Sequence, residues 1–218
     1  MKYINLKASI VSVLMSALLL VSCSDDILEE TPRSTYEPGF FETEAGVLGG
    51  LTSMYAHLRY MYGQAYYYNT TLTGTDEVTY AQSADQNFLV MDVSGQGNIT
   101  PEDSRADAIW DISFSNINTA NGILENAEAA GISQELTSEA RFFRGFDYFL
   151  LVQTFGGVPL DLGAGELAFN TSPSRTSTRN TVPEVYTKAV FPDLISAVEN
   201  LPDNPRVTGG ATKTLARL

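Results

Sequence analysis

The stretch EARFFRGFDYFLLVQTFGGVPL, residues 139–160, is the part of the sequence that most clearly indicates the fold. Together with the residues before it, this stretch predicts a helix over residues 134–154, because apolar side chains recur at three- and four-residue spacings. One face carries Leu136, Ala140, Phe143, Leu150 and Leu151, and the adjoining face carries Phe142, Phe146 and Phe149. A helix that is apolar nearly all round is a buried one, so we expect it at the centre of the fold. The glycines and proline of residues 156–159 should end it.

Three further stretches have helical periodicity. They span residues 43–62, 102–130 and 183–200, and each carries its apolar residues on one face. Thr43 is a plausible N-cap for the first of them. Pro192 lies inside the last and should kink or split it, because proline has no backbone N–H to donate.

The segment between the first two of these stretches, residues 63–97, has no helical period and is too long for an ordinary connection. Its aromatic content argues against disorder. Sugar capture needs flat aromatic faces for the C–H surface of the ring and carboxylate or amide groups for its hydroxyls. Candidates of both kinds lie within fifteen positions: Tyr66, Tyr67, Tyr68, Asp76, Glu77 and Tyr80.

A plainer interpretation of these six residues is structural. Some of the tyrosines would then pack the segment against the helices, while the acids stay in solvent. In an alternating segment only Tyr66 and Tyr68, or Tyr67 alone, would face outward.

The beginning of the chain is typical of an export signal. Lys2 and Lys7 precede an apolar run over residues 8–21, and Ser22-Cys23 follows it. A helix of that run would reach roughly 21 Å, which is short of the roughly 30 Å hydrocarbon core of a bilayer. We therefore interpret residues 1–22 as a signal peptide and not as a transmembrane helix.

The end of this signal, Leu20-Val21-Ser22-Cys23, resembles the bacterial lipobox, in which the chain is cut before a cysteine that carries a diacylglycerol. Cys23 is the only cysteine of the chain, so an internal disulfide is impossible. A chance cysteine after an ordinary signal is the alternative. Two or more acyl chains hold a protein stably on a membrane, so Cys23 is expected to be a lipid anchor.

Residues 23–38 are expected to form an acidic, flexible tether before a helical domain over residues 39–218. Asp25, Asp26, Glu29 and Glu30 stand among Ser, Thr and Pro, a mixture that does not support a packed core. A short acidic stretch behind the cysteine also looks like the surface-export signal of lipoproteins in Gram-negative bacteria. The two interpretations are compatible.

The charge balance limits the classes of partner. The chain has 13 basic and 26 acidic residues and a formal net charge of −13, which removal of residues 1–22 with their two lysines lowers to −15. Such a surface repels phosphate backbones, so we do not expect nucleic-acid binding. His57 is the only histidine and stands outside the apolar stripe of its helix, so neither a metal site nor a cofactor is expected.

Several stretches in order resemble the SusD/RagB family of outer-membrane nutrient-binding lipoproteins. The strongest is the helix of residues 139–155 with its Gly-Gly-Val-Pro exit. The others are Phe40-Phe41, Trp110-Asp111, residues 117–121, Glu184-Val185-Tyr186, Asp193-Leu194 and Leu201-Pro202. The resemblance implies an all-α fold of tetratricopeptide-like helix pairs with long loops. It also implies a surface lid that captures oligosaccharides or other nutrients for a TonB-dependent (SusC-like) transporter in the outer membrane.

Members of the family are much longer, and their second half supplies part of the fold and of the ligand surface. The sequence ends at Leu218, so the helical domain is expected to be incomplete at its C-terminus. Residues 210–213 resemble the opening of the family's next helix. The isolated chain should then expose an apolar patch beside its central helix and bind sugar weakly or not at all.

Other features have plain interpretations. Trp110 could be a platform on which a sugar stacks, but a role in helix packing is favoured. Glu139, Arg141 and Arg144 could be a set of catalytic charges, but an ion network at a helix edge is favoured. A surface glycoside hydrolase needs two carboxyls about 5–5.5 or 6.5–9.5 Å apart across a cleft, for which adjacent acids are poorly placed. We therefore expect no catalytic residue and no enzyme. A helical-repeat scaffold that binds only protein is the remaining alternative.

Overall fold

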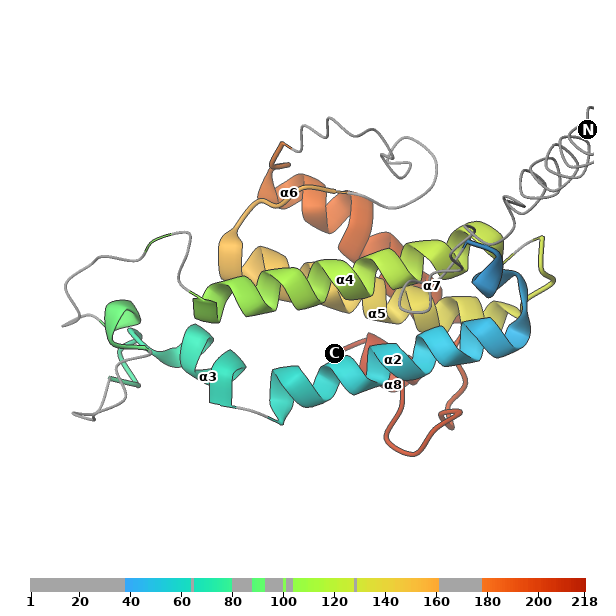
Figure 1. Ribbon diagram of the computed structural model, residues 1–218, viewed down its shortest axis with the longest axis horizontal. Coiled ribbons are helices and arrows are strands. Elements are labelled where there is room, and N and C mark those ends of the chain that lie inside the picture. Colours follow the sequence, from blue (N-terminus) through green and yellow to red (C-terminus); the bar gives the residue numbers. More distant parts are fainter. Residues whose placement is uncertain are drawn as a thin grey trace, which may run out of the picture. The chain divides into compact units, whose positions relative to one another are not determined.

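The structure is a computed structural model. It describes residues 38–63, 65–79, 88–92, 100, 104–127, 129–160 and 178–218. Residues 1–37 and 38–218 are separate units, and the second is the helical domain (Figure 1). The predicted signal peptide, Cys23 and the predicted acidic tether up to residue 37 lie outside the described residues.

The described residues form helices and no strand. The longer α-helices are α2 (Glu44–Tyr62), α3 (Ala65–Leu72), α4 (Ser104–Asn126), α5 (Gln134–Phe155) and α7 (Phe191–Asn200). The short elements are η2 (Pro38–Glu42), η3 (Leu89–Met91), α6 (Val182–Val185), the π-helical turn η5 (Tyr186–Val190) and α8 (Lys213–Ala216). The expectation of an all-α fold is confirmed.

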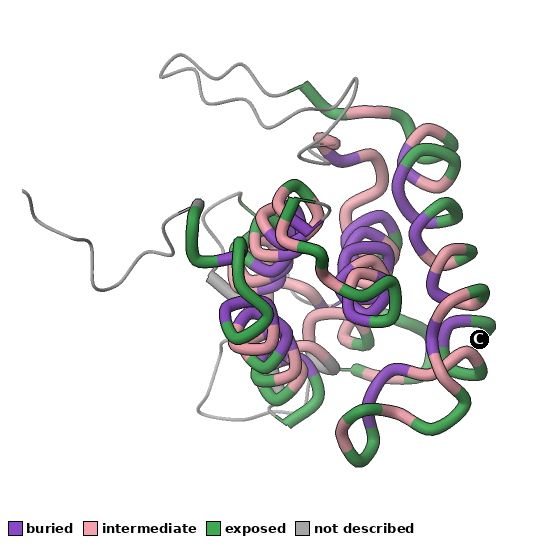
Figure 2. Tube along the Cα trace, turned by 90° about the vertical axis from the view of Figure 1, so that its right-hand side faces the viewer, coloured by how far each residue is buried: buried purple, intermediate pink, exposed green. Residues whose placement is uncertain are grey.

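Helix α5 lies at the centre of the domain. Helices α2, α4 and α5 run antiparallel in succession, and α5 packs mainly against α4 on one side and α7 on the other (Figures 1 and 2). Tyr148, Phe143 and Leu151 on α5 are fully buried. Figure 2 shows buried positions on each of these helices. The central position predicted for this helix is confirmed.

Local signals set the ends of the long helices. The Thr43 hydroxyl accepts a hydrogen bond from the backbone N–H of Gly46 at 3.1 Å, so Thr43 is the N-cap that the sequence predicts. Gly156 ends α5 with a φ of 72°, which glycine adopts without strain. A Cβ on Gly157 would lie 2.0 Å from the carbonyl oxygen of Asn180, so only glycine fits there.

The predicted helix of residues 183–200 runs without a break from Val182 to Asn200 as α6, η5 and α7, and Pro192 follows directly after the π-helical turn that interrupts its α-helical hydrogen bonds. Thr181 and Glu184 form a capping box at its start, with the Thr181 N–H donating to Glu184 Oε2 at 2.9 Å. That hydrogen bond holds the pKa of the Glu184 carboxyl down to about 2. In η5 the N–H of Phe191 donates to the carbonyl of Tyr186, five residues back, immediately before the proline.

The prediction that residues 63–97 lack helix is wrong for residues 65–72, which form α3. Tyrosine, asparagine and threonine have low helix propensity, so the segment gives no signal of its own. Packing stabilises it instead. The ring of Tyr67 meets that of Tyr62 edge-on, with centroids 5.6 Å apart, and belongs to a cluster with Met61, Ile109 and Leu150.

The glycines of α2 and α4 allow close packing around Phe41, which enters the core from η2. A Cβ on Gly50 or on Gly122 would lie 2.8 Å from the ring of Phe41. Phe41 is buried there with Val47, Leu51 and Ile123. Among the described helices, none combines the length and the apolar character that a membrane span requires.

Candidate functional site

The candidate sugar-binding residues lie on α3 and on the turn that follows it. Tyr66, Tyr67 and Tyr68 are consecutive positions of a helix, so they are spread around its axis and do not alternate as in a strand. The interpretation in which Tyr66 and Tyr68 share an outward face is therefore wrong. The side chains of Tyr66 and Tyr68, and the whole of Tyr80, lie outside the described residues.

Asp76 and Glu77 are exposed at the tip of a tight turn. Gly74, with a φ of 88°, donates its N–H to the carbonyl of Val78 at 3.2 Å and so closes the turn. The Thr79 hydroxyl donates to Asp92 at 2.8 Å, which ties the end of this turn to the residue after η3. The two carboxylates are thus presented to solvent by an ordered backbone.

Tyr67 is half-buried and packs between α2 and α4. Its ring contacts Tyr62 and the cluster of Met61, Ile109 and Leu150. These are the contacts that the structural interpretation expects of Tyr67: this tyrosine fastens α3 to the helical domain.

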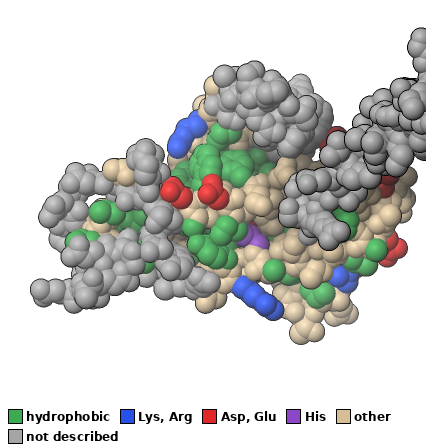
Figure 3. All heavy atoms as spheres, in the orientation of Figure 1, with side chains coloured by type: hydrophobic (Ala, Val, Ile, Leu, Met, Phe, Trp, Pro, Cys, Tyr) green, Lys and Arg blue, Asp and Glu red, His purple; other side chains and the backbone are tan. Residues whose placement is uncertain are grey.

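Trp110 packs in an aromatic cluster. Its ring lies 4.8 Å from that of Phe114 and meets Phe155 edge-on at 5.2 Å. The guanidinium of Arg179 stands 5.9 Å from the ring centroid and donates to the carbonyls of Phe155 and Gly157. The packing role predicted for Trp110 is confirmed. Hydrophobic side chains gather between α4 and α6 on the face seen in Figure 3, beside acidic ones.

An apolar groove opens along α5, with a volume of about 780 Å³. Phe142, Phe146 and Phe149 of α5 form one side, and Tyr62 of α2 lies beside them. The opposite side carries Tyr186, Phe191, Leu194, Ile195 and Val198, and the C-terminal residues 215–218 complete the wall. An apolar surface thus lies beside the central helix, but its exposed side chains belong to α2, α7 and the C-terminal residues and not to α5 itself. We call this feature the α5 groove.

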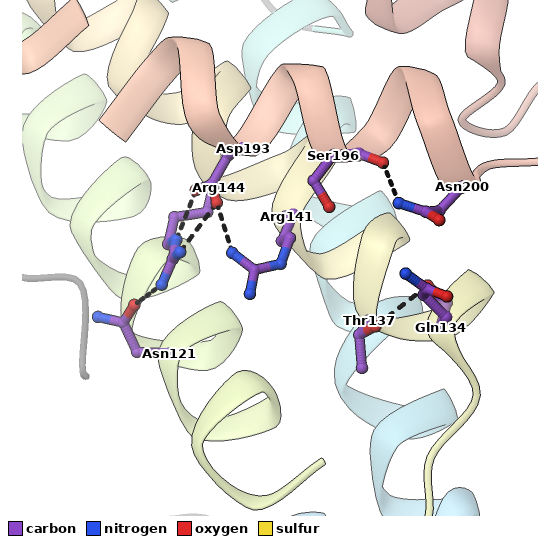
Figure 4. A network of polar contacts seen from close by, with 8 residues as sticks. All are labelled: Asn121, Gln134, Thr137, Arg141, Arg144, Asp193, Ser196 and Asn200. Atoms are coloured by element: carbon purple, nitrogen blue, oxygen red, sulfur yellow. Dashed lines mark hydrogen bonds and ion pairs between the residues drawn. The ribbon is translucent and has the colours of Figure 1, made fainter. Parts of the chain in front are cut away.

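Arg144 on α5 is the centre of a buried polar network (Figure 4). Its guanidinium donates to both carboxylate oxygens of Asp193 on α7, at 2.6 and 2.9 Å, and to the Asn121 side chain of α4 at 2.8 Å. Arg141 adds a second cation to Asp193 at 3.1 Å. The ion-pair interpretation of these arginines is confirmed, but their partner is a buried residue of another helix.

Glu139 has a distant partner as well. It is 3% exposed and accepts two hydrogen bonds from Arg206, at 3.0 and 2.8 Å. Nearby, the Tyr55 hydroxyl accepts the N–H of Ala211 at 2.9 Å, and burial raises the pKa of that phenol. These contacts hold residues 206–211 onto α2 and α5. The sequence predicts Glu139 at a solvent-exposed edge of its helix. In the structure this residue is buried beneath residues 206–211.

His57 is buried, so the prediction that it stands outside the stripe of its helix is wrong. Its Nε2 lies 3.1 Å from Asp147 Oδ1, and the Asn116 amide donates to Asp147 Oδ2 at 2.6 Å. Asp147 is completely buried, and desolvation raises the pKa of its carboxyl although His57 and Asn116 oppose the shift. A buried carboxylate within an apolar helix needs a polar partner. Asp147 in the sequence of α5 therefore indicates that a side chain such as His57 is buried beside it.

Three of the buried carboxylates thus serve the packing of helices. Glu139, Asp147 and Asp193 each face a cation or a histidine from another element. The described part of the chain contains no cluster of three or more His, Cys, Asp or Glu side chains placed to hold a metal ion.

Comparison with known proteins identifies the family. A SusD-like family model described as "Starch-binding associating with outer membrane" matches residues 26–216. The chain therefore belongs to the SusD-like family. SusD-like protein P2 of Formosa agariphila is 28% identical over 207 residues, and SusD-like protein P38 of the same organism is 30% identical over 192 residues.

Solved structures show the same fold. A SusD-like protein of Bacteroides fragilis matches with a TM-score of 0.61 at 21% identity, over 83% of this chain and 34% of its own. A SusD homologue of Bacteroides thetaiotaomicron matches with a TM-score of 0.59 at 20% identity, over 78% and 33%. These likenesses confirm the tetratricopeptide-like helical architecture.

The chain is short beside its relatives. The matches cover 88% and 87% of this chain but 38% and 36% of the P2 and P38 proteins. It therefore spans little more than a third of their length.

Proposed function

We propose that this chain is the helical part of a surface lipoprotein that captures oligosaccharides or related nutrients for a TonB-dependent (SusC-like) transporter. The proposal rests on the match of residues 26–216 to a family described as starch-binding and associated with the outer membrane. A structural relative of Bacteroides fragilis is described as a SusD-like carbohydrate-binding protein. The lipobox before Cys23 supports an anchor in the outer membrane.

The proposed glycan contacts are α3 and the turn after it. Asp76 and Glu77 are exposed on an ordered turn, where their oxygens can accept hydrogen bonds from sugar hydroxyls. Tyr66 or Tyr68, which lie on different sides of α3, and Tyr80 are proposed to supply aromatic faces. Tyr67 has its ring against Tyr62, so its part is to hold α3 in place.

The proposed activity is binding without catalysis. Glycoside hydrolysis requires a pair of carboxyls facing a cleft, and the buried Glu139, Asp147 and Asp193 are engaged with partners inside the helical domain. Neither a metal nor a cofactor has a part in this proposal.

The acids provide a test with a matched control. The material is the mature chain followed by the part of SusD-like protein P2 that lies C-terminal to the matched stretch, which we call the completed chain. Removal of both Asp76 and Glu77 by alanine should weaken binding of a recognised polysaccharide at least about tenfold, because hydrogen bonds to charged groups contribute about 1.5–3 kcal/mol. Isothermal calorimetry against a polysaccharide panel measures it.

The control removes two exposed acids elsewhere, Glu125 and Asp203, and changes the net charge equally. It should bind as the parent does. If both double variants bind with the parent's affinity, the turn after α3 is not part of the glycan site.

A further inference from the structure

We infer that the site on α3 and the turn after it binds glycans that carry no anionic groups and rejects polysaccharides that bear carboxylates or sulfates. The inference rests on the proposed function and adds to it the chemical class of the substrate. The observations behind it are the charge of the segment around α3, the hydrogen bonds within the turn and the carboxylates that the turn presents.

The segment around α3 has no positively charged residue. Residues 60–104 contain six acidic residues and neither lysine, arginine nor histidine. Between Arg59 and Arg141 the chain has a single basic residue, Arg105. Proteins bind carboxylates and sulfates through N–H donors, and the charged donors of arginine and lysine form the strongest of these hydrogen bonds. The segment itself therefore offers an anionic sugar no charged donor.

The backbone N–H groups of the turn after α3 are bonded within the turn. Such groups can bind an anion without a charged side chain when several of them point to one place. Here Thr75 Oγ1 accepts the N–H groups of Glu77 and Val78, at 3.4 and 3.3 Å. The N–H of Thr75 donates to the Leu72 carbonyl at 3.2 Å, and the N–H of Gly74 donates within the turn as well. These four donors are thus not available to an anionic ligand.

The carboxylates of Asp76 and Glu77 are exposed on this turn. The ion pairs of the described residues lie on the other helices and the C-terminal segment, and none of them involves either acid. The backbone of the turn lies against η3, where there is no room for a Cβ between Gly74 and the carbonyl oxygen of Met91. The two carboxylates are therefore presented, without a paired cation, by a backbone that is fixed in place.

Asp92 adds a third carboxylate next to the turn. It is 5% exposed and accepts the Thr79 hydroxyl at 2.8 Å. A hydroxyl donor stabilises a carboxylate but does not cancel its charge. The net charge of −13 of the whole chain has the same sign, so it repels a polyanion at longer range. The local charges and the charge of the whole chain therefore disfavour the same ligands.

A glycan without anionic groups suits these features. Its hydroxyls can donate to the exposed carboxylates, and hydrogen bonds to a charged acceptor are stronger than those to a neutral one. Its C–H surfaces suit the aromatic faces proposed on α3. A uronate or a sulfate ester would instead bring a negative charge beside Asp76 and Glu77 and would find no charged donor in residues 60–104.

Pairs of polysaccharides that share a backbone and differ in charge test the inference. The pairs are starch with carboxymethyl starch, hydroxyethyl cellulose with carboxymethyl cellulose, and methyl-esterified with free polygalacturonate. Calorimetry with the completed chain, and affinity electrophoresis with the mature chain by itself, measure the affinity for each at low and at high salt. At low salt the anionic member of a recognised pair should bind at least about tenfold more weakly, and it should gain affinity as salt screens the repulsion. The affinity for the uncharged member should not change with salt.

Neutralisation of the turn shows whether these acids cause the repulsion. Asp76→Asn with Glu77→Gln keeps a carbonyl acceptor at each position and removes two charges. The affinity for the anionic member, divided by that for the uncharged member, should rise at least about threefold at low salt. The part supplied by P2 is the same in parent and variant, so the change in this ratio reports on this chain alone. The control, Glu125→Gln with Asp203→Asn, removes two charges at other exposed positions and should leave the ratio unchanged.

Equal or tighter binding of the anionic members at low salt would overturn the inference and leave the proposed function intact. A ratio that does not change on neutralisation of Asp76 and Glu77, or that rises equally in the control, would also overturn it, because the selectivity would then not come from the turn. If no polysaccharide of either kind binds to the folded protein, the proposed function fails and the inference fails with it.

Discussion

Asp193 accepts hydrogen bonds from Arg144 at both carboxylate oxygens, at 2.6 and 2.9 Å, and this buried pair joins α7 to the centre of α5. Both side chains are at most 6% exposed. Arg144 also binds Asn121, so one guanidinium connects three helices. A buried charge pair adds little net stability when intact, but the loss of one partner leaves an uncompensated charge.

Asp193→Ala should therefore lower the free energy of unfolding by about 3–5 kcal/mol. The guanidinium of Arg144 would remain buried without its carboxylate. Urea denaturation followed by circular dichroism measures the loss. The control is Lys188→Ala, which breaks the exposed pair with Glu184 and should hardly change the urea midpoint. Equal effects of the two substitutions would contradict the role given to the buried pair.

Asp147 should make stability depend on pH. Burial raises the pKa of its carboxyl in the folded chain above 3.8, the ordinary value that applies to the unfolded chain. At a pH between the unfolded-state and the folded-state pKa, the folded chain therefore holds a proton that the unfolded chain has released. This stabilising contribution is fully present below pH about 4 and is lost as the pH rises through the folded-state pKa.

Asp147→Asn removes this dependence. The free energy of unfolding of the parent, minus that of Asp147→Asn, should fall as the pH rises above about 4. Urea titrations at a series of pH values measure it, with the exposed Asp203→Asn as the control. A difference that stays constant with pH for Asp147→Asn would show that the carboxyl does not titrate abnormally.

Neighbouring glycines of α2 should respond in opposite directions to alanine. A Cβ on Gly50 would lie 2.8 Å from the Phe41 ring and 3.1 Å from Ile123, so Gly50→Ala should destabilise the chain by about 1–3 kcal/mol. A Cβ on Gly49 meets only the Phe40 ring at 3.4 Å, so Gly49→Ala should stabilise α2 by about 0.5–1 kcal/mol. Thermal unfolding of both variants measures these two changes in stability. A stabilising Gly50→Ala would mean that Phe41 can move aside.

The sequence predicts the helices that have a clear apolar stripe. Helix α5 begins at Gln134 as expected and ends one residue later than predicted, because its two apolar faces and its glycine exit are local signals. Helix α3 could not be predicted, because Tyr67 is held by Tyr62 of another helix and the segment has low propensity. In this segment tertiary packing, and not intrinsic helix propensity, determines that a helix forms.

The polar contacts were harder to foresee. The sequence places Glu139, Arg141 and Arg144 together, and a structural role is inferred from that spacing, but their ion-pair partners lie 49 to 67 positions away. His57 and Asp147 are 90 positions apart. Only the fold brings such pairs together, although a carboxylate amid the apolar residues of α5 signals that a partner exists.

The anchor is tested by Cys23→Ala. Without the thiol no diacylglycerol can be attached, so the variant should accumulate as an unlipidated precursor and move from the detergent phase to the aqueous phase in Triton X-114 partitioning. The mature wild-type chain should remain in the detergent phase. Membrane association of Cys23→Ala after a carbonate wash would show that something other than an acyl chain holds the protein.

Glycan capture is tested most directly by affinity electrophoresis of the completed chain in gels that contain starch or other polysaccharides. We predict that at least one polysaccharide retards the completed chain. Alanine at both Tyr66 and Tyr68 removes whichever of the two rings faces the glycan, so it should weaken the affinity at least about tenfold, since an aromatic stacking contact is lost. Tyr186→Ala, which removes a ring from the α5 groove, should leave the retardation unchanged. Unretarded migration of the folded protein across the whole panel would contradict the proposed function, and undiminished retardation of the double tyrosine variant would contradict the site on α3.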